Sequence, residues 1–123
     1  MADYLLDTNV LSKIYYGDAK LKQLIDSFDG GVNTVVYIEC IQGSIKKKDR
    51  ALIKKSLNQL NFYPLTPDIS VKAIELIDKY SASRGLFLAD ALIAATAIVN
   101  DLILVTYNVK DFNFIKGLSV IKP

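Results

Sequence analysis

The 123-residue sequence contains no histidine and no tryptophan, and it has a single cysteine, Cys40. Without histidine, Ser-His-Asp and Cys-His catalytic triads are excluded, and so are zinc sites that need imidazole ligands. Cys40 has no partner for a disulfide within these residues, and its apolar neighbours favour a small buried side chain. Polar chemistry in this chain therefore depends on carboxylates, hydroxyls, amides, lysines or a hard metal ion bound through oxygen.

Long apolar runs are also missing, since none approaches the roughly 20 residues needed to span a bilayer. The first residues lack a basic segment, and their apolar stretch is too short for a signal peptide. We therefore expect a cytoplasmic protein with no membrane association. The composition, 51% hydrophobic and 23% charged, is typical of a globular chain, and the length predicts a single domain over residues 1–123.

The net charge of only +2 gives no overall signature of a nucleic-acid-binding protein. The charge is uneven, however. Residues 46–55, the basic cluster, contain six basic residues and one acidic residue, a local charge of +5 that leaves −3 for the remainder. This cluster has two equally good explanations. It is either a helix face in solvent or a surface that contacts a phosphate backbone or a protein partner.

Short apolar segments alternate with helical patterns along the whole chain. Strands are predicted at 4–6, 32–34, 62–65, 102–106 and 118–121, the third at a sheet edge because it contains Pro64. Helices are predicted after Thr8 or Asn9, at 19–28, 35–42 and 49–60, after Pro67, and at 88–100. This alternation predicts an α/β fold, a three-layer α/β/α sandwich with a short central parallel sheet.

The helix after Pro67 is predicted to face the core with four residues at helical spacing: Val71, Ile74, Ile77 and Tyr80.

Four acidic residues lie in apolar surroundings. Asp7 ends the first strand, Glu39 interrupts Val-Tyr-Ile-Glu-Cys-Ile, Asp90 interrupts Leu-Ala-Asp-Ala-Leu, and Asp111 follows the strongest strand just before a phenylalanine. A buried, ionised carboxylate is costly without compensation. Asp90 in a first helical turn and Asp111 as a capping partner of Asn108 have structural explanations of their own, whereas Glu39 in mid-helix favours a functional role.

Taken together, the four acids predict a site for a hard divalent cation. Few lysines or arginines lie in the same apolar stretches to neutralise them. Mg²⁺ and Mn²⁺ take oxygen ligands and keep several waters. The carboxyl ends of parallel strands also face the crevice in which α/β sheets bind ligands. The residues alone name no substrate.

Four motifs, in order, resemble those of one family over nearly the whole chain. They are residues 4–12 with Asp7-Thr8-Asn9, Thr34 with Glu39 and Gly43, Asp90 with its following alanines, and residues 104–112. On these motifs the sequence is similar to the PIN domain, specifically to a VapC-type toxin of a type II toxin–antitoxin pair.

The resemblance implies an Mg²⁺-dependent endoribonuclease, with Mn²⁺ able to substitute, that hydrolyses RNA phosphodiester bonds with metal-activated water. Asp7 and Asp90 would be the principal metal ligands, and Glu39 and Asp111 would complete the acidic cluster around the metal. All four would be catalytic residues. Four neighbours would support the carboxylates by hydrogen bonds: Thr8, Asn9, Thr106 and Asn108. The implied partners are the RNA substrate, a cognate antitoxin protein and a second copy in a homodimer.

One position departs from the family pattern. Relatives often have arginine or lysine between the threonine and asparagine of the last motif, where this chain has Tyr107, a residue that can stack on a base. Two other functions remain as alternatives. A phosphotransfer domain with Asp7 as nucleophile is disfavoured because position 9 is asparagine, and a PIN-like module that binds RNA without cutting it would keep the same acids.

Overall fold

The computed structural model describes residues 3–44 and 46–123. In this part of the chain five short strands form one sheet: β1 (Tyr4–Leu6), β2 (Gly30–Asn33), β3 (Asn61–Tyr63), β4 (Ile103–Val105) and β5 (Ser119–Ile121). The strand order is β3-β2-β1-β4-β5, and every neighbouring pair is parallel. The edge position predicted for the strand near Pro64 is confirmed, because β3 is an outer strand and ends one residue before that proline.

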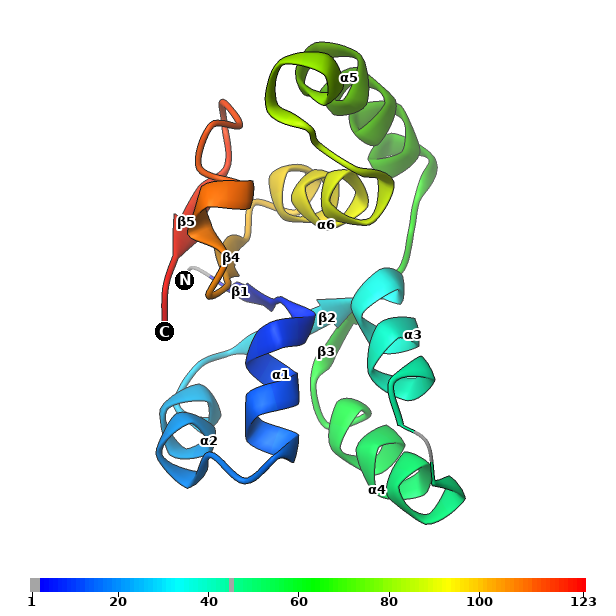
Figure 1. The fold of residues 1–123 in the computed structure, drawn as a ribbon, viewed down its shortest axis with the longest axis vertical. Helices are drawn as coiled ribbons and strands as arrows, with labels where there is room; N and C mark the ends of the chain where they lie inside the picture. The colour runs from blue at the N-terminus through cyan, green and yellow to red at the C-terminus, as the bar shows by residue number, and fades with distance from the viewer. Residues whose placement is uncertain (1–2, 45) are drawn as a thin grey trace.

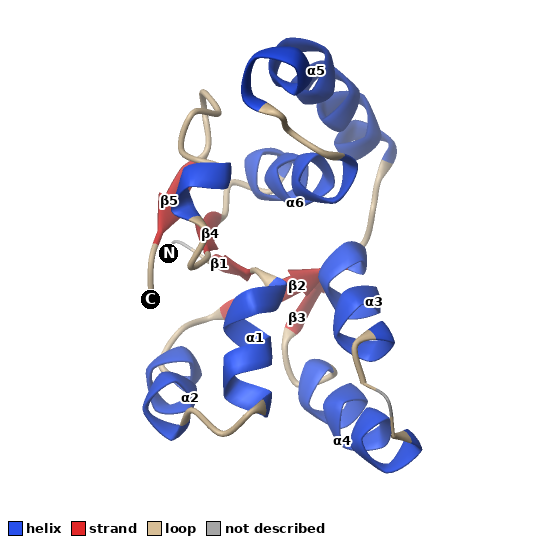
Figure 2. Cartoon of the chain, in the orientation of Figure 1, coloured by secondary structure: helices blue, strands red, loops and turns tan. Residues whose placement is uncertain are grey.

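Helices cover both faces of the sheet. They are α1 (Thr8–Tyr15), α2 (Ala19–Asp26), α3 (Thr34–Gln42), α4 (Lys47–Leu57), α5 (Pro67–Arg84) and α6 (Leu88–Val99), with a 3₁₀ turn η1 (Val109–Asp111). Figure 1 shows α5 and α6 on one side of the sheet and α1, α2 and α4 on the other, and Figure 2 separates the helical layers from the strands by colour. The predicted three-layer α/β/α architecture is therefore confirmed. None of the helices in the described ranges is long and apolar enough to cross a membrane.

The core is built from the short central strands and one apolar helix. Leu5 and Leu6 of β1 and Leu104 and Val105 of β4 are fully buried. Residues 93–97 of α6 are also buried, because this helix lies between α5 and the sheet (Figure 1). Burial on several sides explains why α6 is apolar around most of its circumference.

The core face predicted for α5 is partly wrong. Val71 and Ile74 are 58% and 70% exposed, whereas Ile69, Ala73 and Leu76 are buried. The packing of α5 on α6 buries the stripe of side chains at helical spacing from Ile69. The Thr66 hydroxyl caps this helix by accepting a hydrogen bond from the Ile69 amide at 3.3 Å. Ile77 and Tyr80 remain half-buried beside this stripe, as predicted.

The predicted cap of α1 is also wrong. The helix is capped by Asp7 rather than by Thr8 or Asn9, because Asp7 has extended backbone angles and its carboxylate accepts a hydrogen bond from the Thr8 amide. Thr8 and Asn9 lie in the first turn, and their side chains are free to contact other elements.

A buried amide ties two helices together at the end of the sheet. Asn33, the last residue of β2, is fully buried, and its side-chain oxygen accepts from the Val36 amide at 2.9 Å, which caps α3. Its Nδ2 donates to the hydroxyl of Thr96 in α6 at 3.1 Å. Because α3 carries Glu39 and α6 carries Asp90, this link fixes the relative positions of two of the predicted site residues.

Candidate active site

Asp7 is the most enclosed of the four predicted carboxylates, with 7% of its surface exposed at the junction of β1 and α1. Its Oδ1 accepts from the Thr8 amide at 2.8 Å. Its Oδ2 accepts from the Thr106 hydroxyl at 2.7 Å and from Asn9 Nδ2 at 3.3 Å. Three donors therefore compensate the buried negative charge and set the direction of the carboxylate.

The same donors join the first helical turn to the end of β4. Asn9 Nδ2 also donates to the Thr106 hydroxyl at 3.2 Å, and Asn9 Oδ1 accepts from the Tyr107 amide at 3.2 Å. The backbone amide of Asn108 donates to the Thr106 hydroxyl at 3.0 Å. Of the four predicted supporting residues, Thr8, Asn9 and Thr106 act through their side chains, and Asn108 enters this network through its backbone.

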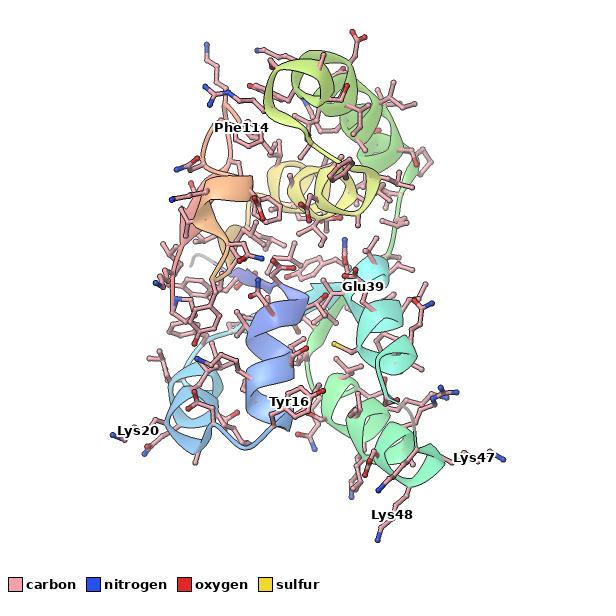
Figure 3. All side chains as sticks on the ribbon, viewed as in Figure 1. Tyr16, Lys20, Glu39, Lys47, Lys48 and Phe114 are labelled. Atoms are coloured by element: carbon pink, nitrogen blue, oxygen red, sulfur yellow. The ribbon has the colours of Figure 1, made fainter. Side chains whose placement is uncertain are left out.

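Glu39 lies on α3 and is half-buried, as its apolar sequence context predicts. Its Oε1 accepts from the Thr8 hydroxyl at 2.7 Å. Thr8 thus donates its amide to Asp7 and its hydroxyl to Glu39, so the two carboxylates are held by one residue. In Figure 3, Glu39 lies well away from Lys47 and Lys48, which point outward from α4.

Asp90 is in the first turn of α6 and is half-buried. Burial, with repulsion from Asp7, Asp111 and Glu39, raises the pKa of Asp90 from 3.8 to about 6. The pKa of Asp7 is also raised, first by burial and then by repulsion from Glu39 and Asp111, although the hydrogen bonds from Thr106 and Thr8 oppose the change. The four carboxylates therefore share one electrostatic neighbourhood.

Asp111 is the most open member of the group and lies at the end of η1. The capping arrangement considered for it does not form, because Asn108 precedes η1 without a side-chain capping bond and the contact between the two residues is backbone to backbone, at 3.0 Å. Asp90 does lie in the first turn of its helix, as the helix-terminus explanation requires. Burial and repulsion from the other three acids nevertheless raise the pKa of Asp90.

The four acids have no cationic partner in the described part of the chain. The ion pairs found there join Lys13 to Asp18, Lys22 to Asp26 and Lys72 to Glu75. Over residues 3–44 and 46–123, no three acidic or cysteine side chains stand close enough to form a ready-made metal site. Mutual repulsion favours such separation, and a hard divalent ion is the partner that this set of oxygen donors fits. The metal and catalytic roles remain predictions.

Cys40 behaves as the sequence predicts. It is buried, and burial with smaller contributions from Glu39 and Asp7 raises the pKa of its thiol to about 12. A thiol with this pKa is un-ionised at neutral pH and is a poor nucleophile or metal ligand.

Sequence reasoning missed Lys13. Its Nζ lies 4.6 Å from the centroid of the Tyr107 ring, beside the Asp7 network. The signal that could have found it is spacing, because Lys13 follows Asn9 by one helical turn, on the same face of α1.

Comparison with known proteins decides the family. The model of the PIN domain family matches residues 4–116. The chain belongs to the PIN domain family. No curated protein sequence matches it.

Solved structures similar to this PIN domain include a toxin–antitoxin complex and two VapBC structures. A chain of a toxin–antitoxin complex from Klebsiella pneumoniae is 29% identical, with 97% of this chain and 96% of that chain covered and a TM-score of 0.82. A chain of DNA-bound VapBC from Salmonella typhimurium is 19% identical, with coverage of 99% and 98% and a TM-score of 0.86. A chain of VapBC-1 from nontypeable Haemophilus influenzae is 21% identical, with coverage of 97% and 96% and a TM-score of 0.82. The Salmonella and Haemophilus structures show the fold alone. The family resemblance carried by the sequence motifs is confirmed.

The raised pKa of Asp90 predicts that Asp90→Asn stabilises the metal-free protein at pH 7. The folded-state pKa, about 6, lies above the ordinary 3.8, so the free energy of unfolding falls as the pH rises between these values. The side chain introduced by Asp90→Asn is an uncharged amide, so the variant does not lose this stability as the pH rises. Full burial would make the gain about 3 kcal/mol, and solvent screening of a half-buried carboxylate reduces it to about 1 kcal/mol.

Urea denaturation in EDTA at pH 4 and pH 7 measures this effect. The gain should be present at pH 7 and nearly absent at pH 4. Asp68→Asn is the matched control, since Asp68 lies in the first turn of α5 and is exposed. An Asp90→Asn protein that is less stable than the wild type at pH 7 in EDTA contradicts the electrostatic explanation.

Proposed function

We propose that this PIN domain is an Mg²⁺-dependent endoribonuclease and the toxin of a VapBC-type toxin–antitoxin system. The observation that carries the proposal is that four carboxylates from separate elements influence one another's charge, and that burial together with this repulsion raises the pKa of Asp7 and of Asp90. Such an arrangement is unfavourable for the apo protein and is relieved by a divalent cation. Similarity to chains from toxin–antitoxin complexes supports the biological role.

The metal, when bound, supplies an activated water and neutralises charge on the phosphate. Asp7 and Asp90 are assigned to hold it. Thr106 and Asn9 orient Asp7 through their hydrogen bonds to Oδ2, and the bond from Thr106 opposes the rise in the pKa of that carboxyl that burial causes. Thr8 occupies Oε1 of Glu39, so Oε2 is the atom assigned to accept a proton from the attacking water. Asp111 adds negative charge at the open side of the site.

The proposed partner is an antitoxin that docks beside the acids. A groove of about 550 Å³ lies between α1, α3 and α4, and its lining includes Tyr16, Leu52 and Ile53, with Glu39 at one part and Lys46 at another. Tyr16 is 90% exposed although it is aromatic. An amphipathic segment with acidic residues would cover the apolar lining and face the basic cluster.

The second proposed partner is another copy of this chain. Ile38 on α3 and the pair Phe87 and Leu88 at the start of α6 are exposed, the last two at 77% and 70%, and α3 and α6 are in contact. Large apolar side chains left in solvent on two adjacent helices favour an interface between copies.

The ribonuclease proposal predicts that Asp7→Asn or Asp90→Asn lowers the rate of RNA cleavage in Mg²⁺ by at least about 100-fold, because each change removes a charged metal ligand. Cleavage of a mixed RNA pool, with circular dichroism of each variant, measures activity and fold together. Asp68→Asn should cleave like the wild type.

Undiminished cleavage by either site variant, or unfolding of both variants, counts against the assignment. A wild-type protein that binds RNA and leaves it intact in both Mg²⁺ and Mn²⁺ supports the alternative of a non-catalytic RNA-binding module.

The docking proposal predicts that the double variant Tyr16→Ser/Leu52→Ser weakens binding of the cognate antitoxin at least about tenfold, since both side chains lose apolar contact area. Charge reversal at Lys47 and Lys48 should also weaken it. Calorimetric titration measures both effects, with Val71→Ser/Ile74→Ser as a control that removes two exposed apolar side chains from α5. Charge reversal without loss of antitoxin or RNA binding rejects a role for the basic cluster.

The dimer proposal predicts that Phe87→Ser/Leu88→Ser gives a monomer in sedimentation equilibrium, while the wild type and the α5 control variant remain dimers. Serine at position 87 suits the cap of α6, where Phe87 provides no side-chain hydrogen bond, so the fold should persist. A monomeric wild type, or a dimer that survives the substitution, refutes this interface.

A further inference from the structure

Lys13 and Tyr107 form a structured pair next to the acidic site. The amide of Tyr107 donates to Asn9 Oδ1 at 3.2 Å, and Asn9 Nδ2 donates to Asp7 Oδ2 at 3.3 Å. Lys13, one helical turn after Asn9, places its ammonium 4.6 Å from the centroid of the Tyr107 ring. Asn9 therefore joins the backbone of Tyr107 to Asp7, and Lys13 lies one turn further along the same helix, against the Tyr107 ring.

The charge of Lys13 is only weakly engaged within the protein. Its one ion-pair contact in the described chain is with Asp18, at 3.9 Å, and the side chain is exposed. The Asp18 carboxylate already accepts from the Leu21 amide at 3.0 Å as the cap of α2. A cation–π contact restricts an ammonium without cancelling its charge, unlike a close carboxylate. Lys13 thus presents a restrained positive charge to solvent.

An RNA backbone that approaches four carboxylates is repelled unless positive charge lies beside its path. Lys47 and Lys48 of the basic cluster do not supply that charge beside Glu39, since they point outward from α4, away from it (Figure 3). Lys13 lies on the helix that begins at Asp7 and contacts the residue that follows Thr106.

We propose that Lys13, positioned by the face of the Tyr107 ring, binds a phosphate of the RNA backbone next to the carboxylates. This inference rests on the proposed ribonuclease function and adds to it a substrate-binding subsite. Lys13 touches substrate and serves binding, whereas Tyr107 acts through Lys13 as a positioning residue.

The test uses the full chain and a labelled single-stranded RNA of mixed sequence. Lys13→Gln is expected to raise KM for cleavage about fivefold with kcat changed less than twofold, and to lower the salt dependence of RNA binding by about one phosphate contact. Lys13→Arg should recover most of the loss. Tyr107→Leu should raise KM, and Tyr107→Phe should raise it less, because the ring is retained.

Lys20→Gln is the matched control, because Lys20 is an exposed lysine on α2 that points away from the body of the protein in Figure 3. It should change neither KM nor the salt dependence.

Binding is also measured by fluorescence anisotropy with Ca²⁺ in place of Mg²⁺, so that the inference is judged apart from cleavage. A wild type that binds RNA but leaves it intact in both Mg²⁺ and Mn²⁺ overturns the ribonuclease proposal, while a weaker Lys13→Gln complex in Ca²⁺ still supports the subsite. A Lys13→Gln protein with wild-type KM and salt dependence, or with lower kcat and unchanged KM, overturns the subsite. Failure of the wild type both to bind and to cut RNA overturns both.

Discussion

The buried carboxylate of Asp7 is the constraint on which the site depends. An ionised group with 7% exposure must receive hydrogen bonds, and here they come from the Thr8 amide, the Thr106 hydroxyl and Asn9. These donors belong to the start of α1 and the end of β4, so satisfying one carboxylate also fixes the junction of the sheet with its first helix. Thr8 then extends the same network to Glu39. The positions of Asp7 and Glu39 are therefore linked through Thr8.

Repulsion between the four acids connects this arrangement to function. Burial is the largest cause of the raised pKa values of Asp7 and Asp90, and repulsion from the other carboxylates adds to it. The fold accepts that unfavourable energy because Asn33 and Thr96 hold α3 and α6 in place from within the core. A site of this kind favours a divalent ion, and without one it repels the backbone of a nucleic acid. The restrained positive charge of Lys13 matters because it attracts the backbone that the carboxylates repel.

Local patterns in the sequence were sufficient for the layers and for the four acids. Strands such as 4–6 and the apolar helix of Asp90 are recognised from short runs, and a carboxylate inside such a run is conspicuous. The rotation of α5 was not predictable from its apolar residues, because Val71 and Ile74 fit a helical stripe as well as Ile69 does, and only the packing of α5 against α6 decides between them. The contact of Lys13 with Tyr107 joins residues 94 positions apart in the chain, which no local pattern encodes.

The central claim, that these carboxylates hold a divalent cation, is tested most directly by Mn²⁺ binding to the RNA-free protein, measured by electron paramagnetic resonance. The account predicts that the wild type removes free Mn²⁺ from the spectrum, that Mg²⁺ competes for the same site, and that Asp7→Asn loses this binding while Asp68→Asn retains it. Equal Mn²⁺ binding by the wild type and Asp7→Asn, or none by the wild type at millimolar Mn²⁺, would contradict it.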